Sequence, residues 1–148
     1  MISPQDQALM AQALRLAEQG RYSTSPNPMV GCIIASNDGQ VLSQGYHQVA
    51  GQAHAEINAL NNATADVRAA TAYVTLEPCA HSGRTGPCTQ ALIDAGIARV
   101  VIAMQDPNPL VAGRGIEQLR GAGITVELMS NAIAAEQLNR GFIKRMSH

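Results

Sequence analysis

The sequence predicts an α/β fold, a three-layer α/β/α sandwich on a five-stranded mixed sheet. An Asn-Asp-Gly turn at 37–39 joins two apolar segments, which is typical of an antiparallel hairpin. After this hairpin, segments with helical periodicity alternate with short apolar segments, which implies right-handed crossovers and parallel strands covered on both faces. The chain has 148 residues, the usual size of one domain, so a single domain over 1–148 is expected.

Each element is predicted from its own pattern. Ser3, Pro4 and Asp6 supply a capping side chain, a first-turn proline and an acid, so a helix should begin there and extend to about Gln19, before Gly20. The strands are expected at 29–35, 40–46, 72–76, 99–104 and 125–128, with the first two antiparallel and the later ones parallel. Further helices are expected at about 54–62, 88–95, 113–122 and 132–144.

Composition excludes several classes of function. Ten basic residues balance eleven acidic ones and Lys144 is the only lysine, so there is no basic field for nucleic acid. Aromatic residues make up 3%, too few for the stacking platforms of single-strand binders. No apolar segment reaches the roughly 18 residues of a membrane span, and no signal peptide pattern opens the chain. We expect a cytoplasmic protein without membrane or nucleic-acid partners, and its assembly into a homo-oligomer stays open.

The histidines and cysteines predict a zinc site. Three cysteines are an odd number and a poor disulfide framework, and in a reducing compartment they more often bind metal or do chemistry. His54, Cys79 and Cys88 form a three-ligand set for one Zn²⁺ per chain, which leaves the fourth tetrahedral position for water. As an alternative, His81 could close the site and make it structural. Cys32 lies within an apolar strand and is expected to be a small buried side chain.

Glu56 is the predicted proton carrier. Side chains two positions apart within a helix point to nearly opposite faces, so His54 and Glu56 can serve one site only at a helix entrance, which the loop at 48–53 allows. Glu56 would take a proton from the water and pass it to a ring nitrogen and then to the departing amine. H-x-E followed by P-C resembles the signature of zinc base deaminases, although eight residues rather than two separate the cysteines.

The inserted residues, 80–87, belong to the longest irregular segment of the chain, Glu77 to Pro87, and suggest function. They include His81 and Arg84, polar groups suited to the phosphate or ring edge of a substrate. The stretch at 113–115 only superficially resembles a nucleotide-binding fingerprint, because Gln118 stands at the position of the third glycine. We interpret that stretch as a helix entrance.

Four segments resemble the deaminase domain of the bifunctional riboflavin-biosynthesis deaminase/reductase, in the cytidine deaminase-like superfamily. They are S-P-N-P-M-V-G-C at 25–32, H-A-E at 54–56, T-L-E-P-C-A-H-S-G-R-T-G-P-C at 75–88 and D-P-N-P at 106–109. The resemblance covers nearly the whole chain, and the eight-residue cysteine spacing is its most specific part. It implies hydrolytic deamination of 2,5-diamino-6-ribosylamino-4(3H)-pyrimidinone 5′-phosphate to 5-amino-6-(5-phosphoribosylamino)uracil and ammonia.

The resemblance also implies a role for individual residues. The zinc ligands match His54, Cys79 and Cys88, and the proton-shuttling glutamate matches Glu56. The substrate-binding positions match Asn27, His47, His81, Arg84, Asp106 and Asn108, with the last two expected at the ribose-phosphate end. Purely structural interpretations remain for some of these positions, because Asn27 could shape a turn, His47 could end a strand and 106–109 could be turn chemistry alone.

The family's second domain, an NADPH-dependent reductase, has no counterpart in these 148 residues. We expect either a free-standing deaminase or a piece of a longer chain, and NADPH is expected only where a full-length protein carries the reductase. Two other functions stay open from the sequence. The chain could be a deaminase of another base or nucleoside, or a non-catalytic binding module stabilised by zinc.

Overall fold

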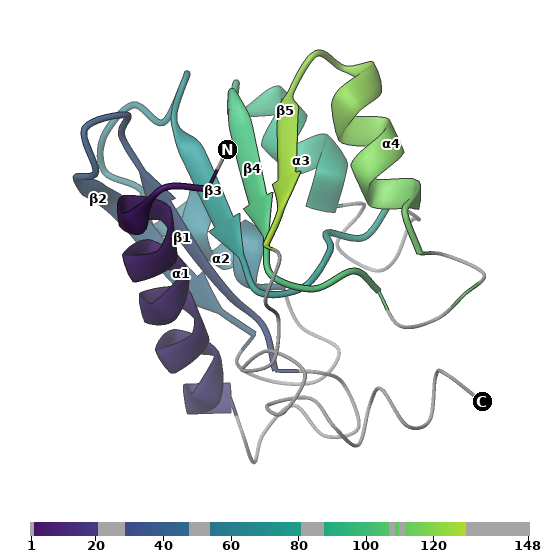
Figure 1. Cartoon of the computed structure of the whole chain (residues 1–148). Coiled ribbons are helices and arrows are strands. Elements are labelled where there is room, and N and C mark those ends of the chain that lie inside the picture. Colours follow the sequence, from purple (N-terminus) through teal and green to yellow (C-terminus); the bar gives the residue numbers. More distant parts are fainter. Residues whose placement is uncertain are drawn as a thin grey trace.

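A five-stranded mixed sheet forms the middle layer of the fold (Figure 1). The computed structural model describes residues 2–20, 29–47, 54–80, 88–106, 109 and 112–129. The strand order is β2-β1-β3-β4-β5, with β1 antiparallel to both β2 and β3, and β3, β4 and β5 parallel to one another. The strands are β1 (Gly31–Ala35), β2 (Val41–Tyr46), β3 (Thr71–Val74), β4 (Arg99–Ile102) and β5 (Thr125–Leu128). The predicted mixed sheet is confirmed.

Helices cover both faces of the sheet, as predicted. One face carries α1, and the other carries α2, α3 and α4 (Figure 1). The helices are α1 (Pro4–Ala17), α2 (Ala55–Asn62), α3 (Cys88–Asp94) and α4 (Arg114–Gly121), and a 3-10 turn at Glu18–Gly20 extends α1. The helix expected at 132–144 lies outside the described residues.

Two glycines allow helices to approach the sheet closely from opposite sides. A Cβ on Gly31 would lie 2.1 Å from the carbonyl oxygen of Ala13 in α1. A Cβ on Gly45 would lie 2.4 Å from the backbone nitrogen of Ala59 in α2. Because Gly45 stands opposite Cys32 in the β1–β2 register, Cys32 shares the face covered by α2, where it is fully buried as expected.

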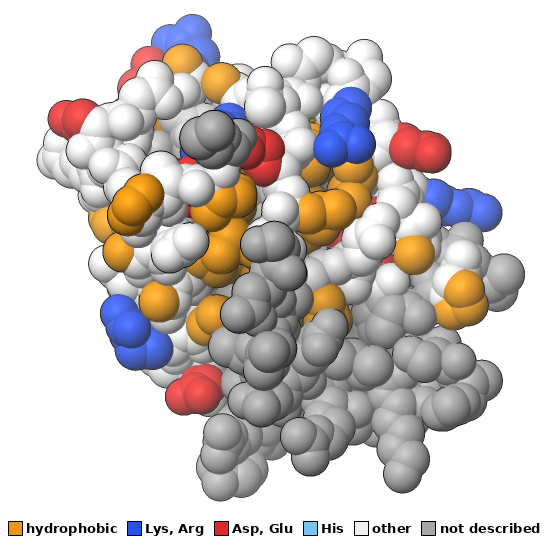
Figure 2. All heavy atoms as spheres, in the orientation of Figure 1, with side chains coloured by type: hydrophobic (Ala, Val, Ile, Leu, Met, Phe, Trp, Pro, Cys, Tyr) orange, Lys and Arg blue, Asp and Glu red, His pale blue; other side chains and the backbone are white. Residues whose placement is uncertain are grey.

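The apolar core fills both interfaces between sheet and helices. It includes the fully buried side chains of Met10, Ile33, Ile34, Val74, Leu92, Val100, Val101, Ile102 and Leu119. Among the described residues, no helix is long and apolar enough to cross a membrane. Figure 2 shows one face of the molecule, on which the described basic and acidic side chains are scattered and gather into no basic patch.

A buried polar cluster pins the start of α1 to the sheet. Ser3 caps the helix as the sequence predicts, and the side chains of Ser3 and Asp6 together form a capping box. Asp6 also accepts hydrogen bonds from the Tyr73 hydroxyl at 2.6 Å and from two Arg99 nitrogens at 2.9 Å each. The Arg99 guanidinium is the main reason that the pKa of Asp6 lies well below its ordinary value. Arg99 in turn donates to Glu127 on β5 at 2.7 Å, so the cluster links α1 with three strands.

Candidate metal centre and active site

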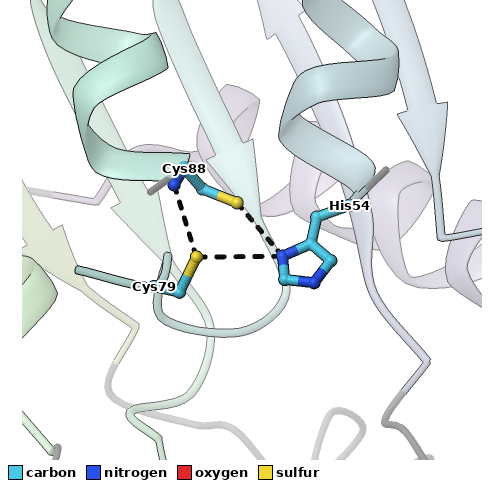
Figure 3. A group of neighbouring side chains, drawn as sticks. All are labelled: His54, Cys79 and Cys88. Carbon is cyan, nitrogen blue, oxygen red and sulfur yellow. Dashed lines mark hydrogen bonds between the residues drawn. The ribbon is translucent and has the colours of Figure 1, made fainter. Parts of the chain in front are cut away.

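Three donor side chains meet at the end of the sheet where β3 stops (Figure 3). His54 precedes α2, Cys79 follows β3, and Cys88 is the first residue of α3. The Nδ1 atom of His54 lies 3.1 Å from the Cys88 sulfur and 3.8 Å from the Cys79 sulfur, and the three donor atoms all lie within 4.8 Å of one another. Three segments that are distant in sequence thus form one cluster.

The starts of two helices give this cluster its geometry. His54 is the N-cap of α2, with extended backbone angles of φ −73° and ψ 169°, which confirms the predicted helix entrance. The backbone N–H of Cys88, at the start of α3, donates to the Cys79 sulfur at 3.3 Å. Hydrogen bonds from the Cys88 thiol, from His54 and from this N–H lower the pKa of Cys79 to about 4. These contacts favour the thiolate form of Cys79, which is the form that binds metal.

The donor set fits a zinc ion. Zinc binds imidazole nitrogen at about 2.0–2.1 Å and thiolate sulfur at about 2.3 Å, so tetrahedral neighbours lie roughly 3.5–3.8 Å apart. The measured distances of 3.1 and 3.8 Å bracket that spacing. One imidazole and two sulfurs also favour zinc over magnesium or calcium, because the latter two ions prefer oxygen ligands. His81, the alternative fourth ligand, lies outside the described residues.

Glu56 lies in the first turn of α2, two positions after the histidine. Its side chain is buried, with 3% exposed, and this burial raises its pKa to about 7. The nearby His54 acts in the opposite direction on Glu56, and Glu56 raises the pKa of His54 in return. Glu56 is thus a carboxyl group beside the donor cluster that can gain or lose a proton near neutral pH.

His47 is brought to the same place. It follows β2, its side chain is buried, and its ring packs edge-on against the ring of His54 with centroids 5.2 Å apart and planes at 63°. Its backbone N–H donates to the carbonyl of Val30 at 3.0 Å, which holds it at the sheet end. A role of His47 in substrate binding, which the family resemblance implies, stays a prediction.

A cavity of about 90 Å³ lies beside Cys79. It is lined by Glu77, Pro78, Cys79, Ala80, Asp106, Arg114 and Gly115. Asp106, one of the predicted substrate-binding residues, therefore lines the same cavity as Cys79. The other predicted substrate contacts, Asn27, His81, Arg84 and Asn108, lie outside the described residues.

Two residues of this cavity, Glu77 and Arg114, have no role predicted from the sequence. The position of Glu77 in the sequence does indicate a structural role, because an acid that follows a buried strand directly before Pro78 and Cys79 needs hydrogen-bond donors. Its donors come from residues 29 to 39 positions later in the chain, which no local pattern indicates. Arg114 opens α4 beside the cavity, and only the fold brings it near Cys79.

Known proteins share these features. The family model of the cytidine and deoxycytidylate deaminase zinc-binding region matches residues 3–104, which include His54, Glu56, Cys79 and Cys88. The chain belongs to this family. In this family, the His/Cys/Cys group corresponds to a zinc-binding region, and the predicted cytidine deaminase-like fold is confirmed.

The most informative relatives are proteins of riboflavin biosynthesis. The Escherichia coli riboflavin biosynthesis protein RibD is 58% identical over 142 residues, which are 96% of this chain and 38% of that protein. The diaminohydroxyphosphoribosylamino-pyrimidine deaminase of Buchnera aphidicola is 45% identical over 141 residues, with 95% of both chains covered. The structure of Acinetobacter baumannii RibD, form 2, gives a TM-score of 0.93 at 54% identity, over 97% of this chain and 40% of that one. The family resemblance predicted from the sequence is confirmed.

Proposed function

We propose that this chain catalyses the hydrolytic deamination of 2,5-diamino-6-ribosylamino-4(3H)-pyrimidinone 5′-phosphate, releasing 5-amino-6-(5-phosphoribosylamino)uracil and ammonia in the cytoplasm. The observation that carries the proposal is the buried Glu56 carboxyl group beside the His54, Cys79 and Cys88 donor cluster. The chain spans 38% of the E. coli relative, so any NADPH-dependent reduction belongs to a reductase domain where a protein has one. The B. aphidicola relative, similar along 95% of its length, carries only the deaminase name.

His54, Cys79 and Cys88 would hold one Zn²⁺. When bound, zinc acts as a Lewis acid that lowers the pKa of a coordinated water to about 7. Glu56 would take up the proton of the attacking water and deliver it to the ring nitrogen, and would then carry a second proton to the departing amine. A carboxyl group whose pKa is about 7 suits both directions of transfer, because it is neither a much stronger acid nor a much weaker one than its partners.

The substrate end of the site is proposed from the family resemblance together with the cavity beside Cys79. Asp106 lines that cavity, and His47 packs on His54. We assign Asn27, His47 and His81 to substrate binding, Arg84 to the phosphate, and Asp106 and Asn108 to the ribose-phosphate end. Arginine suits this role because its planar guanidinium pairs with two phosphate oxygens at once.

Ammonia release by the purified chain from the proposed substrate tests the function directly. The zinc-loaded protein should turn over, the protein treated with a strong chelator should not, and added zinc should restore the activity. Deoxycytidylate and free cytidine serve as alternative substrates in the same assay. Turnover of one of these, with none of the diamino substrate, would assign the chain to another deaminase of the family. Absence of turnover with every base would favour a zinc-stabilised binding module.

The phosphate end has its own test. Arg84→Ala should raise KM for the phosphorylated nucleotide more than for its dephosphorylated form, because only the former has the anion that Arg84 would bind. Arg15→Ala is the matched control, an exposed arginine on α1. Equal effects on both substrates would mean that Arg84 serves the ring or the loop instead.

A further inference from the structure

We propose that Glu77 is a positioning residue for the metal centre, whose carboxylate joins the Cys79 segment, the Asp106 segment and the start of α4 into one unit. Glu77 lies three residues beyond β3 and two before Cys79. It is 6% exposed, and its backbone N–H donates to the Met104 carbonyl at 2.9 Å, beyond the end of β4. The side chain thus starts from a fixed point beyond the ends of β3 and β4.

Four backbone N–H groups converge on this one carboxylate. Oε1 accepts from Asp106 at 3.1 Å and from Gly113 at 3.0 Å, while Oε2 accepts from Gly115 at 2.9 Å and from Ile116 at 3.4 Å. Gly113 is the N-cap of α4 and has no side chain to accept from the first turn. Glu77 therefore supplies the cap of α4 from another segment, and its negative charge faces the positive end of the helix dipole.

The start of α4 rests directly on the segment that carries the cysteine. A Cβ on Gly115 would lie 2.1 Å from the carbonyl oxygen of Pro78, so only glycine permits this contact. Thr89, next to Cys88, donates from its hydroxyl to Gln118 of α4 at 2.6 Å. The segments that carry both sulfur donors are thus held against α4. The Cys79 segment contacts α4 through Glu77 and Pro78, and the Cys88 segment contacts it through Thr89.

This arrangement gives Glu77 an effect on zinc that a merely buried acid would not have. Loss of its hydrogen bonds would free Cys79 and Asp106 together, so both the metal ligand and the cavity wall would lose their fixed positions. Partners that orient metal ligands typically change metal affinity or activity by about 10- to 100-fold when they are replaced. The activity part of this inference rests on the proposed function, whereas the effect on zinc affinity does not.

The test is Glu77→Gln, which keeps the size of the side chain but replaces one accepting oxygen with a donating NH₂ group. We expect zinc binding, measured by competition with a chromophoric chelator, to weaken by about 10- to 100-fold, and kcat to fall at saturating zinc. Asp6→Asn is the matched control, because Asp6 is also a buried carboxylate that caps a helix, but at α1. It should destabilise the fold while zinc affinity stays unchanged. Wild-type zinc affinity and kcat in Glu77→Gln would overturn the proposal.

A second measurement needs no variant and applies even where Glu77→Gln does not fold. Coupling between two sites is reciprocal, so if the Glu77 bonds help to bind zinc, zinc must strengthen those bonds by the same factor. Amide hydrogen exchange of Asp106, Gly113 and Gly115 should therefore slow by about 10- to 100-fold on zinc addition. The Asp6 amide, which donates to Ser3, is the internal control. Equal exchange at the three amides with and without zinc would overturn the proposal, whatever the chain deaminates.

Discussion

Asp6 and Glu56 are both carboxyl groups that are 3% exposed, yet the chain treats them in opposite ways. The carboxylate of Asp6, at the first turn of α1, receives hydrogen bonds from Arg99, Tyr73 and the backbone N–H of Ser3, and these hold its pKa well below the ordinary value. Glu56, at the first turn of α2, lies among the metal donors, and burial raises its pKa to about 7. The first is an anion that stabilises the fold, and the second is the proton carrier that we propose.

The difference lies in the partners rather than in depth. A buried carboxylate stays charged where donors and a cation offset the loss of water, and it takes up a proton where they do not. Two guanidinium nitrogens of Arg99 each donate to a carboxylate oxygen of Asp6 at 2.9 Å. At Glu56, burial outweighs the nearby His54 and the hydrogen bonds that lower the pKa, and the charge of Cys79 raises the pKa further. The raised pKa of Glu56 therefore reflects compensation that is weaker than the compensation at Asp6.

The largest effect is expected for Glu56→Gln. Removal of a proton carrier should lower kcat/KM by about 10²–10⁴-fold, because the amide can neither accept nor deliver a proton. Zinc content should stay at one per chain, and the free energy of unfolding should not fall, since a buried charge is removed. Glu117→Gln, an exposed glutamate on α4, is the control. Ammonia release, metal analysis and urea unfolding check the result, and full deamination by Glu56→Gln would contradict the assigned role.

Asp6→Asn should show the reverse pattern. Breaking a buried ion pair usually costs about 3–5 kcal/mol, and we expect about 2–3 kcal/mol here because the Arg99 side chain keeps 23% of its surface exposed. The activity of the folded protein should stay at the wild-type level, since the cluster lies on the face of the sheet that α1 covers. Urea unfolding and ammonia release measure the two effects. A loss of kcat comparable to that of Glu56→Gln would contradict this separation of the two carboxyl groups.

Asp6 also makes the stability of the fold depend on pH. The pKa of Asp6 is lowered on folding, so its stabilisation is fully present above the unfolded-state pKa of about 3.9 and is lost as pH falls toward the lower folded value. The difference in unfolding free energy between wild type and Asp6→Asn should therefore be constant from pH 7 to about 5 and should shrink below about 4. Urea unfolding of both proteins across this range, with chelator present throughout, measures it. A difference that grew on acidification would show that Asp6 is not the group responsible.

Much of both regions can be predicted from sequence where the signal is local. The residues that cap α1, Ser3 and Asp6, lie within four consecutive positions. The two-residue spacing of His54 and Glu56 indicates a helix entrance, if both residues serve one site. The donors to Asp6 and Glu77 cannot be read in this way. Arg99 reaches Asp6 across 93 positions, because the pairing of strands and the docking of α1 bring the two residues together. The raised pKa of Glu56 likewise depends on burial, which exists only once the layers have packed.

The smallest effect is expected for Tyr73→Phe, which removes one of the donors to Asp6 and leaves the ring in the core. A hydrogen bond to a charged group contributes about 1.5–3 kcal/mol, and we expect the lower end because the two Arg99 contacts remain. Burial and the Asp6 bond raise the pKa of Tyr73 to about 12, so this contribution is fully present below about pH 10 and is lost as pH rises toward 12. Unfolding free energies of wild type and Tyr73→Phe at pH 8 and pH 11 should therefore differ less at the higher pH. An equal difference at both pH values would contradict the prediction, because it would mean that folding does not raise the pKa of the Tyr73 hydroxyl.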